Sequence, residues 1–135
     1  MKSTYPLMDS VGAELRAASG RPLAEVTPDA LAAGALAAGD VTVDATTLRR
    51  QAEIARDAGF VQLADNLTRA AELTAVPNEE LLEMYELLRP GRARHSQLLA
   101  LADKLETTFS APTTAAYVRE VATVYLARGL CLADE

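Results

Sequence analysis

The stretch from Leu48 to Pro90 reads LRRQAEIARDAGFVQLADNLTRAAELTAVPNEELLEMYELLRP and decides the fold of this chain. Apolar residues recur in it every three or four positions, the spacing that places them on one face of an α-helix. Gly59 and Pro77 interrupt the pattern at points where helices end. The stretch carries no catalytic constellation, so it predicts consecutive helices that pack through short turns as antiparallel neighbours.

The same patterns extend to both sides of this stretch. Thr27, Pro28 and Asp29 signal the start of a short helix in an Ala-rich segment that ends at Gly39, and Gly34 weakens the middle of that helix by roughly 1 kcal/mol relative to alanine. From Asp40 onward we expect five helices. Their expected inward faces, in chain order, are Leu48, Ala52, Ala55 and Ala58; Leu63, Leu67, Ala70, Ala71 and Thr74; Leu81, Met84, Tyr85 and Leu88; Leu98, Leu101, Ala102, Leu105 and Phe109; and Tyr117, Val121, Val124 and Tyr125.

The composition also favours helices. The chain has 135 residues, of which 50% are hydrophobic, but it has no Trp, four Tyr and two Phe, so the core must be built from Leu, Ala and Val. We predict an all-α fold in which a compact helical body of about five helices, residues 40–135, follows an extended N-terminal arm, residues 1–39, that contains a short helix. No domain boundary is expected after Asp40.

Charge and cysteine content exclude several classes of partner. The formal net charge of -6 repels phosphate backbones, and no basic face is evident, so nucleic acid is not an expected partner. Cys131 is the only cysteine and cannot form an internal disulfide, and no secretory or membrane-spanning segment is present. We therefore expect a reducing, cytoplasmic setting without membrane association.

One turn near the centre of the chain could carry chemistry. His95 is the only imidazole, and it lies in a basic turn with Arg89, Arg92 and Arg94. No nucleophile motif accompanies it, so a solvated loop histidine is the favoured interpretation. The alternative is that the three arginines clamp a carboxylate or an acidic patch of a partner.

The remaining candidates also favour structural roles. Cys131 has no second thiol or imidazole nearby in sequence and is interpreted as a structural thiol. Four carboxylates that share one helix lack a Glu-x-x-His pair and are interpreted as helix-start charge; they are Glu79, Glu80, Glu83 and Glu86. Neither the cobalamin-binding pattern Asp-x-His-x-x-Gly nor a phosphate-cradling loop occurs. We predict no catalytic, cofactor-binding or metal-binding residue in this chain.

Several blocks of the sequence carry a family resemblance. They are Thr47 to Gly59, AAELTAVP at Ala70 to Pro77, and LRP at Leu88 to Pro90, with further matches at Tyr5-Pro6-Leu7, at Leu98 to Asp103, at Leu105-Glu106 and from Val118 to Tyr125. With these blocks the chain closely resembles the small (gamma) subunit of the adenosylcobalamin-dependent diol and glycerol dehydratases. The resemblance covers most of the chain, although it is thin between Met8 and Thr46.

The resemblance implies a function in a complex. In this family large (alpha), medium (beta) and small subunits assemble as a dimer of heterotrimers that converts propane-1,2-diol or glycerol to an aldehyde and water by radical chemistry. The resemblance implies that the larger subunits hold adenosylcobalamin and the substrate-site metal ion. The small subunit is then expected to pack outside the large one and to support assembly without catalysing the reaction.

Two departures from the family pattern change local expectations. The segment Ala93 to Gln97 replaces the family's Ser-Thr-Lys-Glu-Glu, so we expect Ser96 to cap a later start of the fourth helix. Some family members carry an N-terminal extension associated with bacterial microcompartments, but only four residues precede Tyr5 here, so targeting through this chain is not expected.

Two other functions remain as alternatives. One is a free-standing helical binding or regulatory domain, and the other is a small helical enzyme that holds an anionic substrate with Arg89, Arg92 and Arg94. The extent of the resemblance favours the dehydratase subunit over both. The sequence leaves open whether the diol or glycerol is preferred, because the resemblance places the substrate pocket on another subunit.

Overall fold

The computed structural model describes residues 3–134, which form α-helices and short 3-10 turns without any strand in that range. Contacts divide the chain into two compact units: the first unit ends at Thr74 and the second unit begins at Ala75. The all-α prediction and the short arm helix are confirmed. The proposed division into an arm, 1–39, and a helical body, 40–135, stays a prediction.

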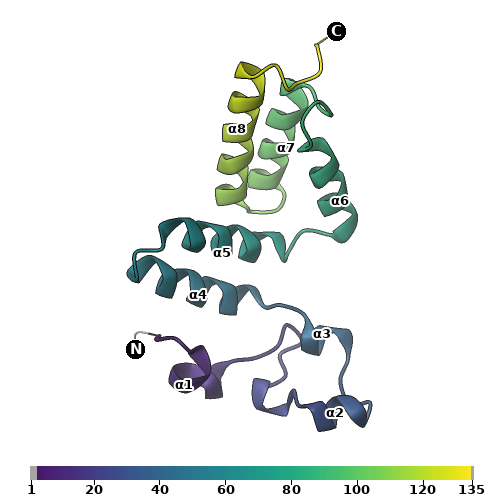
Figure 1. Ribbon diagram of the computed structural model, residues 1–135. Helices are drawn as coiled ribbons and strands as arrows, with labels where there is room; N and C mark the ends of the chain where they lie inside the picture. Colours follow the sequence, from purple (N-terminus) through teal and green to yellow (C-terminus); the bar gives the residue numbers. More distant parts are fainter. Residues whose placement is uncertain (1–2, 135) are drawn as a thin grey trace. The chain divides into compact units, whose positions relative to one another are not determined.

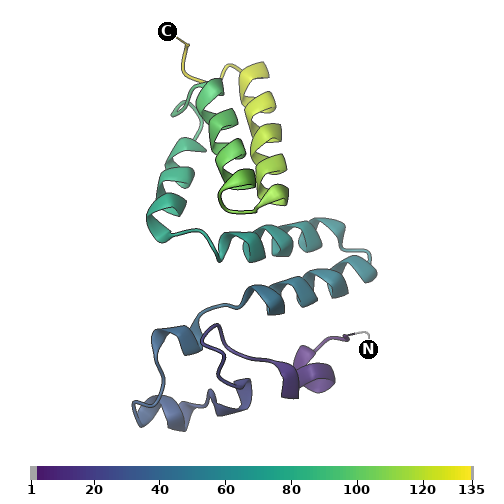
Figure 2. The same ribbon diagram turned by 180° about the vertical axis from the view of Figure 1, so that it is seen from behind.

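The first unit contains the arm and a helical hairpin. Helices α4 and α5 run antiparallel and lie side by side in both views (Figures 1 and 2). The elements of this unit are α1 (Leu7–Val11), η1 (Gly12–Glu14), η2 (Leu23–Glu25), α2 (Pro28–Ala32), α3 (Ala38–Val41), α4 (Ala45–Asp57) and α5 (Val61–Leu73).

Helix α4 begins and ends where the sequence predicts. The Asp44 carboxylate accepts a hydrogen bond of 3.0 Å from the backbone N–H of Thr47, which caps the helix. After the helix Gly59 adopts a φ of +87°, and the N–H of Phe60 donates to the carbonyl of Ala55 at 2.8 Å. This hydrogen bond and the left-handed glycine form a Schellman turn that reverses the chain into α5.

The hairpin buries alanines rather than the larger residues of the expected stripes. Ala52, Ala55, Ala64 and Ala71 are buried, whereas four residues expected to face inward are exposed: Ala58, Leu63, Ala70 and Thr74. Closely packed helices accommodate small side chains on their contact line, and larger side chains then lie at its edges. The assignment of these four residues to the inward face was therefore wrong, and α5 ends at Leu73 rather than at Pro77.

The beginning of the arm packs against α4. Leu7, Val11 and Leu15 form a buried cluster, and the partly buried Leu23 and Ile54 pack against it. An ion pair of 3.2 Å between Arg50 of α4 and Glu14 reinforces the contact. The sequence did not predict α1, because Gly12 and Pro6 flank an apolar segment of only five residues.

The short arm helix forms, but it is shorter than the Ala-rich segment. The Thr27 hydroxyl accepts a hydrogen bond of 3.1 Å from the N–H of Ala30, as expected of an N-cap. Helix α2 ends at Ala32, and Gly34 follows with a φ of +69°. Gly34 therefore terminates the helix and does not lie in its middle, which corrects the sequence-based expectation.

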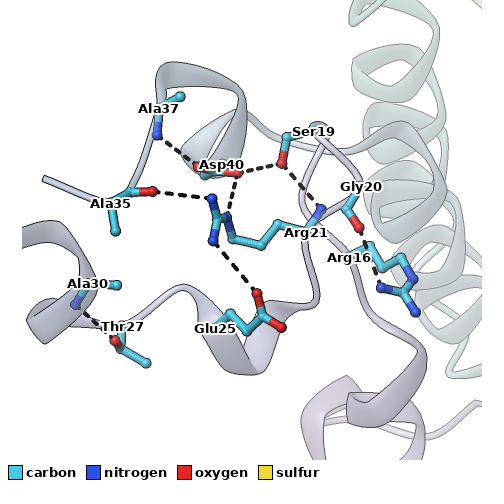
Figure 3. A network of polar contacts seen from close by, with 10 residues as sticks. All are labelled: Arg16, Ser19, Gly20, Arg21, Glu25, Thr27, Ala30, Ala35, Ala37 and Asp40. Atoms are coloured by element: carbon cyan, nitrogen blue, oxygen red, sulfur yellow. Dashed lines mark hydrogen bonds and ion pairs between the residues drawn. The ribbon is translucent and has the colours of Figure 1, made fainter.

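A polar network holds the end of the arm together (Figure 3). We call its three central residues, Ser19, Arg21 and Asp40, the Asp40 clasp. The Asp40 side chain is buried and accepts hydrogen bonds from the Ser19 hydroxyl at 2.5 Å and from the backbone N–H of Ala37 at 2.7 Å. The guanidinium of Arg21 lies 3.1 Å from the same carboxylate and donates to the carbonyl of Ala35 at 3.2 Å. The clasp thus joins backbone segments on both sides of α2.

The second unit is a three-helix arrangement with its own core. It contains α6 (Asn78–Leu87), α7 (His95–Thr107) and α8 (Pro112–Ala127), of which α7 and α8 form an antiparallel pair (Figure 1). The main buried residues of this unit are Met84, Ala93, Leu98, Ala102, Leu105, Ala111, Ala115, Val118 and Ala122. In both units, no helix within residues 3–134 is long and apolar enough to cross a membrane.

The sequence predicted the inward face of α7 more accurately than that of α8. Leu98, Ala102 and Leu105 are buried as expected. On α8, however, Tyr117 and Val124 are exposed, so their assignment to the inward face was wrong, whereas Tyr125 packs against a buried cluster as expected. The buried positions of this pair combine alanines with Leu98, Leu105 and Val118, and the alanines allow the helices to approach closely.

The start of α7 also differs from the expectation. The helix begins at His95, and the N–H of Arg94 donates to the Gln97 side-chain oxygen at 2.9 Å. Gln97 at the third helical position therefore closes the helix start, as in one half of a capping box. The predicted cap at Ser96 with a later start is wrong.

Loss of side-chain volume at Leu105 is expected to destabilise the second unit. Leu105→Ala should lower the free energy of unfolding by about 2 to 5 kcal/mol because the side chain is fully buried. The matched control Leu82→Ala removes a leucine that is 69% exposed and should change stability by less than about 0.5 kcal/mol. Urea unfolding of both variants measures the difference, and equal effects would contradict this assignment of the core.

The stability that Asp40 supplies should depend on pH. The hydrogen bond from Ser19, the N–H of Ala37 and the Arg21 guanidinium together hold the pKa of Asp40 below its ordinary 3.8, although burial acts in the opposite direction. The contribution of Asp40 to folding stability is therefore fully present above pH 3.8, and it is lost as the pH falls through the lower pKa of the folded state. Asp40→Asn should destabilise the protein near neutral pH and differ less from the parent chain in acid. Denaturant unfolding across this range tests the claim, and a pH-independent difference would contradict it.

Candidate subunit interface

An apolar groove is the main candidate site of the first unit. It is open to solvent, and its volume is about 500 Å³. The arm contributes Tyr5, and α4, the turn after it and α5 contribute the rest of the wall. The full lining is Tyr5, Gln51, Ile54, Ala55, Ala58, Phe60, Leu63 and Leu67.

Large side chains of this groove are unusually exposed. Tyr5 is 77% exposed, Phe60 is 63% exposed and Leu63 is 51% exposed. Neighbouring apolar side chains of this size mark surfaces that another protein covers, and aromatic residues often supply most of the binding energy there. The groove offers shape and apolar area but little polar chemistry beyond Gln51, so it suits protein contact better than catalysis.

Local sequence explains how the groove forms. The Schellman turn at Gly59 brings Phe60 out at the end of the hairpin, where nothing in the first unit covers the ring. Leu63 and Leu67 are four residues apart and therefore share one face of α5. Tyr5 reaches the same groove because the buried cluster of Leu7, Val11 and Leu15 holds the arm against Ile54.

The basic turn is not arranged as an anion clamp. Arg89 and Arg92 both pair with the carboxylate of Glu86, at 3.4 and 3.8 Å. Arg94 points to the C-terminal segment and donates to the carbonyl of Ala133 at 3.3 Å. Two of the three guanidinium groups thus pair with one carboxylate and the third donates to a backbone carbonyl, which weakens the alternative of a small enzyme with an arginine clamp.

The C-terminal segment lies along this turn. The N–H of Gly91 donates to the carbonyl of Leu130 at 2.7 Å, and the N–H of Leu132 donates to the carbonyl of Ala93 at 2.9 Å. Cys131, between them, is half-buried and packs against the cluster of Ala93, Leu98 and Ala122, consistent with the structural thiol that the sequence suggests. His95 is half-buried at the start of α7 rather than free in a loop.

Two of the four carboxylates of α6, Glu80 and Glu86, are engaged in ion pairs. Glu80 accepts a hydrogen bond of 2.6 Å from Lys104, which raises the pKa of that lysine, and Glu86 pairs with two arginines. On the neighbouring helices Arg119 contacts Asp103 and Glu106, and these hydrogen bonds raise the pKa of the guanidinium. In the described range, 3–134, no three His, Cys, Asp or Glu residues are grouped so that they could hold a metal ion.

Sequence reasoning did not find the groove. It placed Leu63 and Leu67 on the inward face of α5 and did not single out Phe60, yet Leu63 and Phe60 are exposed and Leu67 is only half-buried. A signal was present, because Phe60 and Val61 directly follow the turn glycine, where an exposed chain reversal ordinarily has polar residues. Consecutive apolar residues at such a position are typical of surfaces that take part in protein contacts.

The geometry defines a class of protein: a small helical chain with an exposed apolar groove. Comparison with known proteins agrees with that class. Residues 1–131 match the family described as "Dehydratase small subunit", and the chain belongs to this family. The family that the sequence blocks indicated is therefore confirmed.

Two relatives are similar over nearly the whole chain. The propanediol dehydratase small subunit of Citrobacter freundii is 41% identical over 131 residues, which cover 97% of this chain and 76% of the relative. The propanediol dehydratase small subunit of Salmonella typhimurium is 41% identical over 133 residues, which cover 98% of this chain and 77% of the relative.

Changes at the two isolated reactive side chains should affect stability and not turnover. His95→Ala should alter the free energy of unfolding by less than about 0.5 kcal/mol, because its side chain is only half-buried. Cys131→Ser places a hydroxyl beside an apolar cluster and should cost about 1 kcal/mol. Thermal unfolding of the chain and aldehyde formation by its dehydratase complex are the two measurements. A large loss of turnover in either variant would contradict a purely structural role for that residue.

Proposed function

We propose that this chain is the non-catalytic small subunit of an adenosylcobalamin-dependent diol dehydratase. The observation that carries the proposal is its 41% identity to propanediol dehydratase small subunits over nearly the full chain. Its partners are the large and medium subunits, and the assembly is a dimer of heterotrimers. The reaction converts propane-1,2-diol or glycerol to an aldehyde and water.

The chemistry belongs to the other subunits in this proposal. Adenosylcobalamin supplies a radical that abstracts a substrate hydrogen, and such a radical requires a protein cavity that excludes competing reactions. The larger subunits hold this cofactor and the substrate-site metal ion. The sequence of this chain supports that division because it lacks the Asp-x-His-x-x-Gly pattern, and two arginines of the basic turn, Arg89 and Arg92, pair with Glu86.

The apolar groove of the first unit is the proposed contact with the large subunit. Burying Phe60, Leu63 and Tyr5 against another chain would remove the largest exposed apolar side chains of that face from water. A cytoplasmic location is part of the same proposal, and its support is the single, unpaired Cys131.

Reconstitution tests the proposed function. The purified chain should form no aldehyde from propane-1,2-diol or glycerol, with or without adenosylcobalamin. Adding the large and medium subunits together with the cofactor should restore aldehyde formation, and affinity purification of the chain should recover both larger subunits. Turnover by the purified chain alone, or recovery of no larger subunit, would contradict the proposal.

Removing the aromatic anchor of the groove should weaken assembly. Phe60→Ser should reduce the affinity for the large subunit by about tenfold or more, because an aromatic residue at the centre of an interface commonly contributes about 2 kcal/mol or more. Turnover for each assembled complex should stay near that of the parent, since Phe60 does not contact substrate in this proposal. Binding titration and turnover on the same preparations measure both quantities.

A matched control distinguishes an effect specific to this groove from the effect of removing any exposed apolar side chain. Leu82→Ser removes a similarly exposed side chain from α6, outside the groove. It should leave the affinity for the large subunit within a few-fold of the parent. If Leu82→Ser weakened assembly and Phe60→Ser did not, the interface would have been placed on the wrong unit.

A further inference from the structure

We propose that the Asp40 clasp orders the arm of the free subunit before it meets the other dehydratase subunits. This inference rests on the proposed function and concerns the moment at which the arm acquires its structure. A segment that folds only on binding must lose its conformational entropy during assembly. A clasp that closes beforehand removes that cost from the association step.

The clasp is needed because the arm buries little apolar surface after its first helix. Between Arg16 and Asp40 only Ala17 and Asp40 are buried, and η2 and α2 contain no buried residue. Helices this short are unstable without tertiary contact. Apolar burial alone therefore does not offset the entropy of fixing this backbone, and the polar contacts must supply the difference.

The geometry of the clasp suits that task. Ser19 and Asp40 are 21 positions apart, and their side chains meet at 2.5 Å. The N–H of Ser19 also donates to the carbonyl of Gly39 at 3.0 Å, and a Cβ on Gly39 would lie 3.4 Å from the Ser19 Cβ. The two ends of the loop are therefore joined by side-chain and backbone contacts together. Hydrogen bonds to an ionised carboxylate are stronger than neutral ones, which favours the closed loop.

Arg21 connects the clasp to the middle of the loop. Its guanidinium lies 3.1 Å from the Asp40 carboxylate and 3.6 Å from that of Glu25, and it donates to the carbonyl of Ala35 (Figure 3). One cation thus contacts η2, the residues after α2 and the start of α3. Arg21 therefore lies at the centre of the polar contacts that fold this loop.

Backbone hydrogen bonds connect the clasp to the part of the arm that lines the groove. The N–H of Ala17 donates to the carbonyl of Arg21 at 2.9 Å, and the N–H of Leu23 donates to that of Leu15 at 3.0 Å. Leu15 belongs to the buried cluster that packs against Ile54 and holds α1, which begins two residues after the groove residue Tyr5. An ordered loop therefore supports the position of Tyr5 in the free subunit, and the groove is complete before a partner arrives.

Amide exchange on the free, full-length chain tests the inference. In Asp40→Asn, peptides that cover residues 19–40 should exchange about tenfold faster or more, while α7 and α8 keep the parent rates. Ser19→Ala keeps the carboxylate and should give a smaller increase in the same peptides. The control Asp29→Asn removes an equal charge from an exposed position of α2 and should leave the exchange of residues 19–40 near the parent rate.

The outcomes separate the alternatives. Unprotected exchange of residues 19–40 in the parent chain, unchanged exchange in both clasp variants, or a uniform increase that includes α7 and α8 would each overturn the inference. If Asp40→Asn does not fold, Ser19→Ala decides the result. A parent chain that fails to bind the larger subunits would contradict the proposed function, whereas the exchange data on the free chain would still decide whether the clasp orders the arm.

Discussion

Close approach of helices through alanine is the constraint on which this structure depends. Both units contain an antiparallel helix pair, and the most buried positions of these helices include Ala64, Ala71, Ala102, Ala115 and Ala122. A methyl group contributes little apolar area, so each contact must be close-packed to stabilise the fold. In the first unit the larger side chains lie at the edges of the contact, whereas in the second unit Leu98, Leu105 and Val118 are fully buried beside the alanines. On α5 this position at the edge leaves Leu63 exposed and creates the apolar groove.

The arm is not stabilised by close helix packing. Its first part is held by apolar contacts of Leu7, Val11 and Leu15, but its second part depends on one buried carboxylate and its donors. Removing one partner from such a network leaves a buried charge uncompensated, which costs more than the loss of an exposed ion pair. The pairs on the surface of α7 and α8, such as Arg119 with Asp103, are exposed and contribute little by comparison. The order of the arm therefore depends on a small number of polar contacts.

The sequence predicted the helices better than it predicted their faces. Local signals identified the helices after Asp44, Thr27 and Pro77 because caps, prolines and turn glycines act within a few residues. The inward faces of α5 and α8 were misassigned because periodicity alone cannot distinguish a leucine at an interface edge from one in the core. The clasp joins residues 21 positions apart, so no local pattern revealed it. The absence of catalytic motifs was visible in the sequence, whereas the groove required the exposure of Phe60 to be known.

In the proposed function this chain acts through the surface that it presents to the other subunits, and the central claim is that this surface is the groove. Amide exchange compared between the free chain and the chain assembled with the large and medium subunits tests that claim most directly. We expect peptides spanning Ile54 to Leu67 to become protected on assembly. Identical exchange of those peptides in both states, with protection confined to α6, α7 or α8, would contradict the claim.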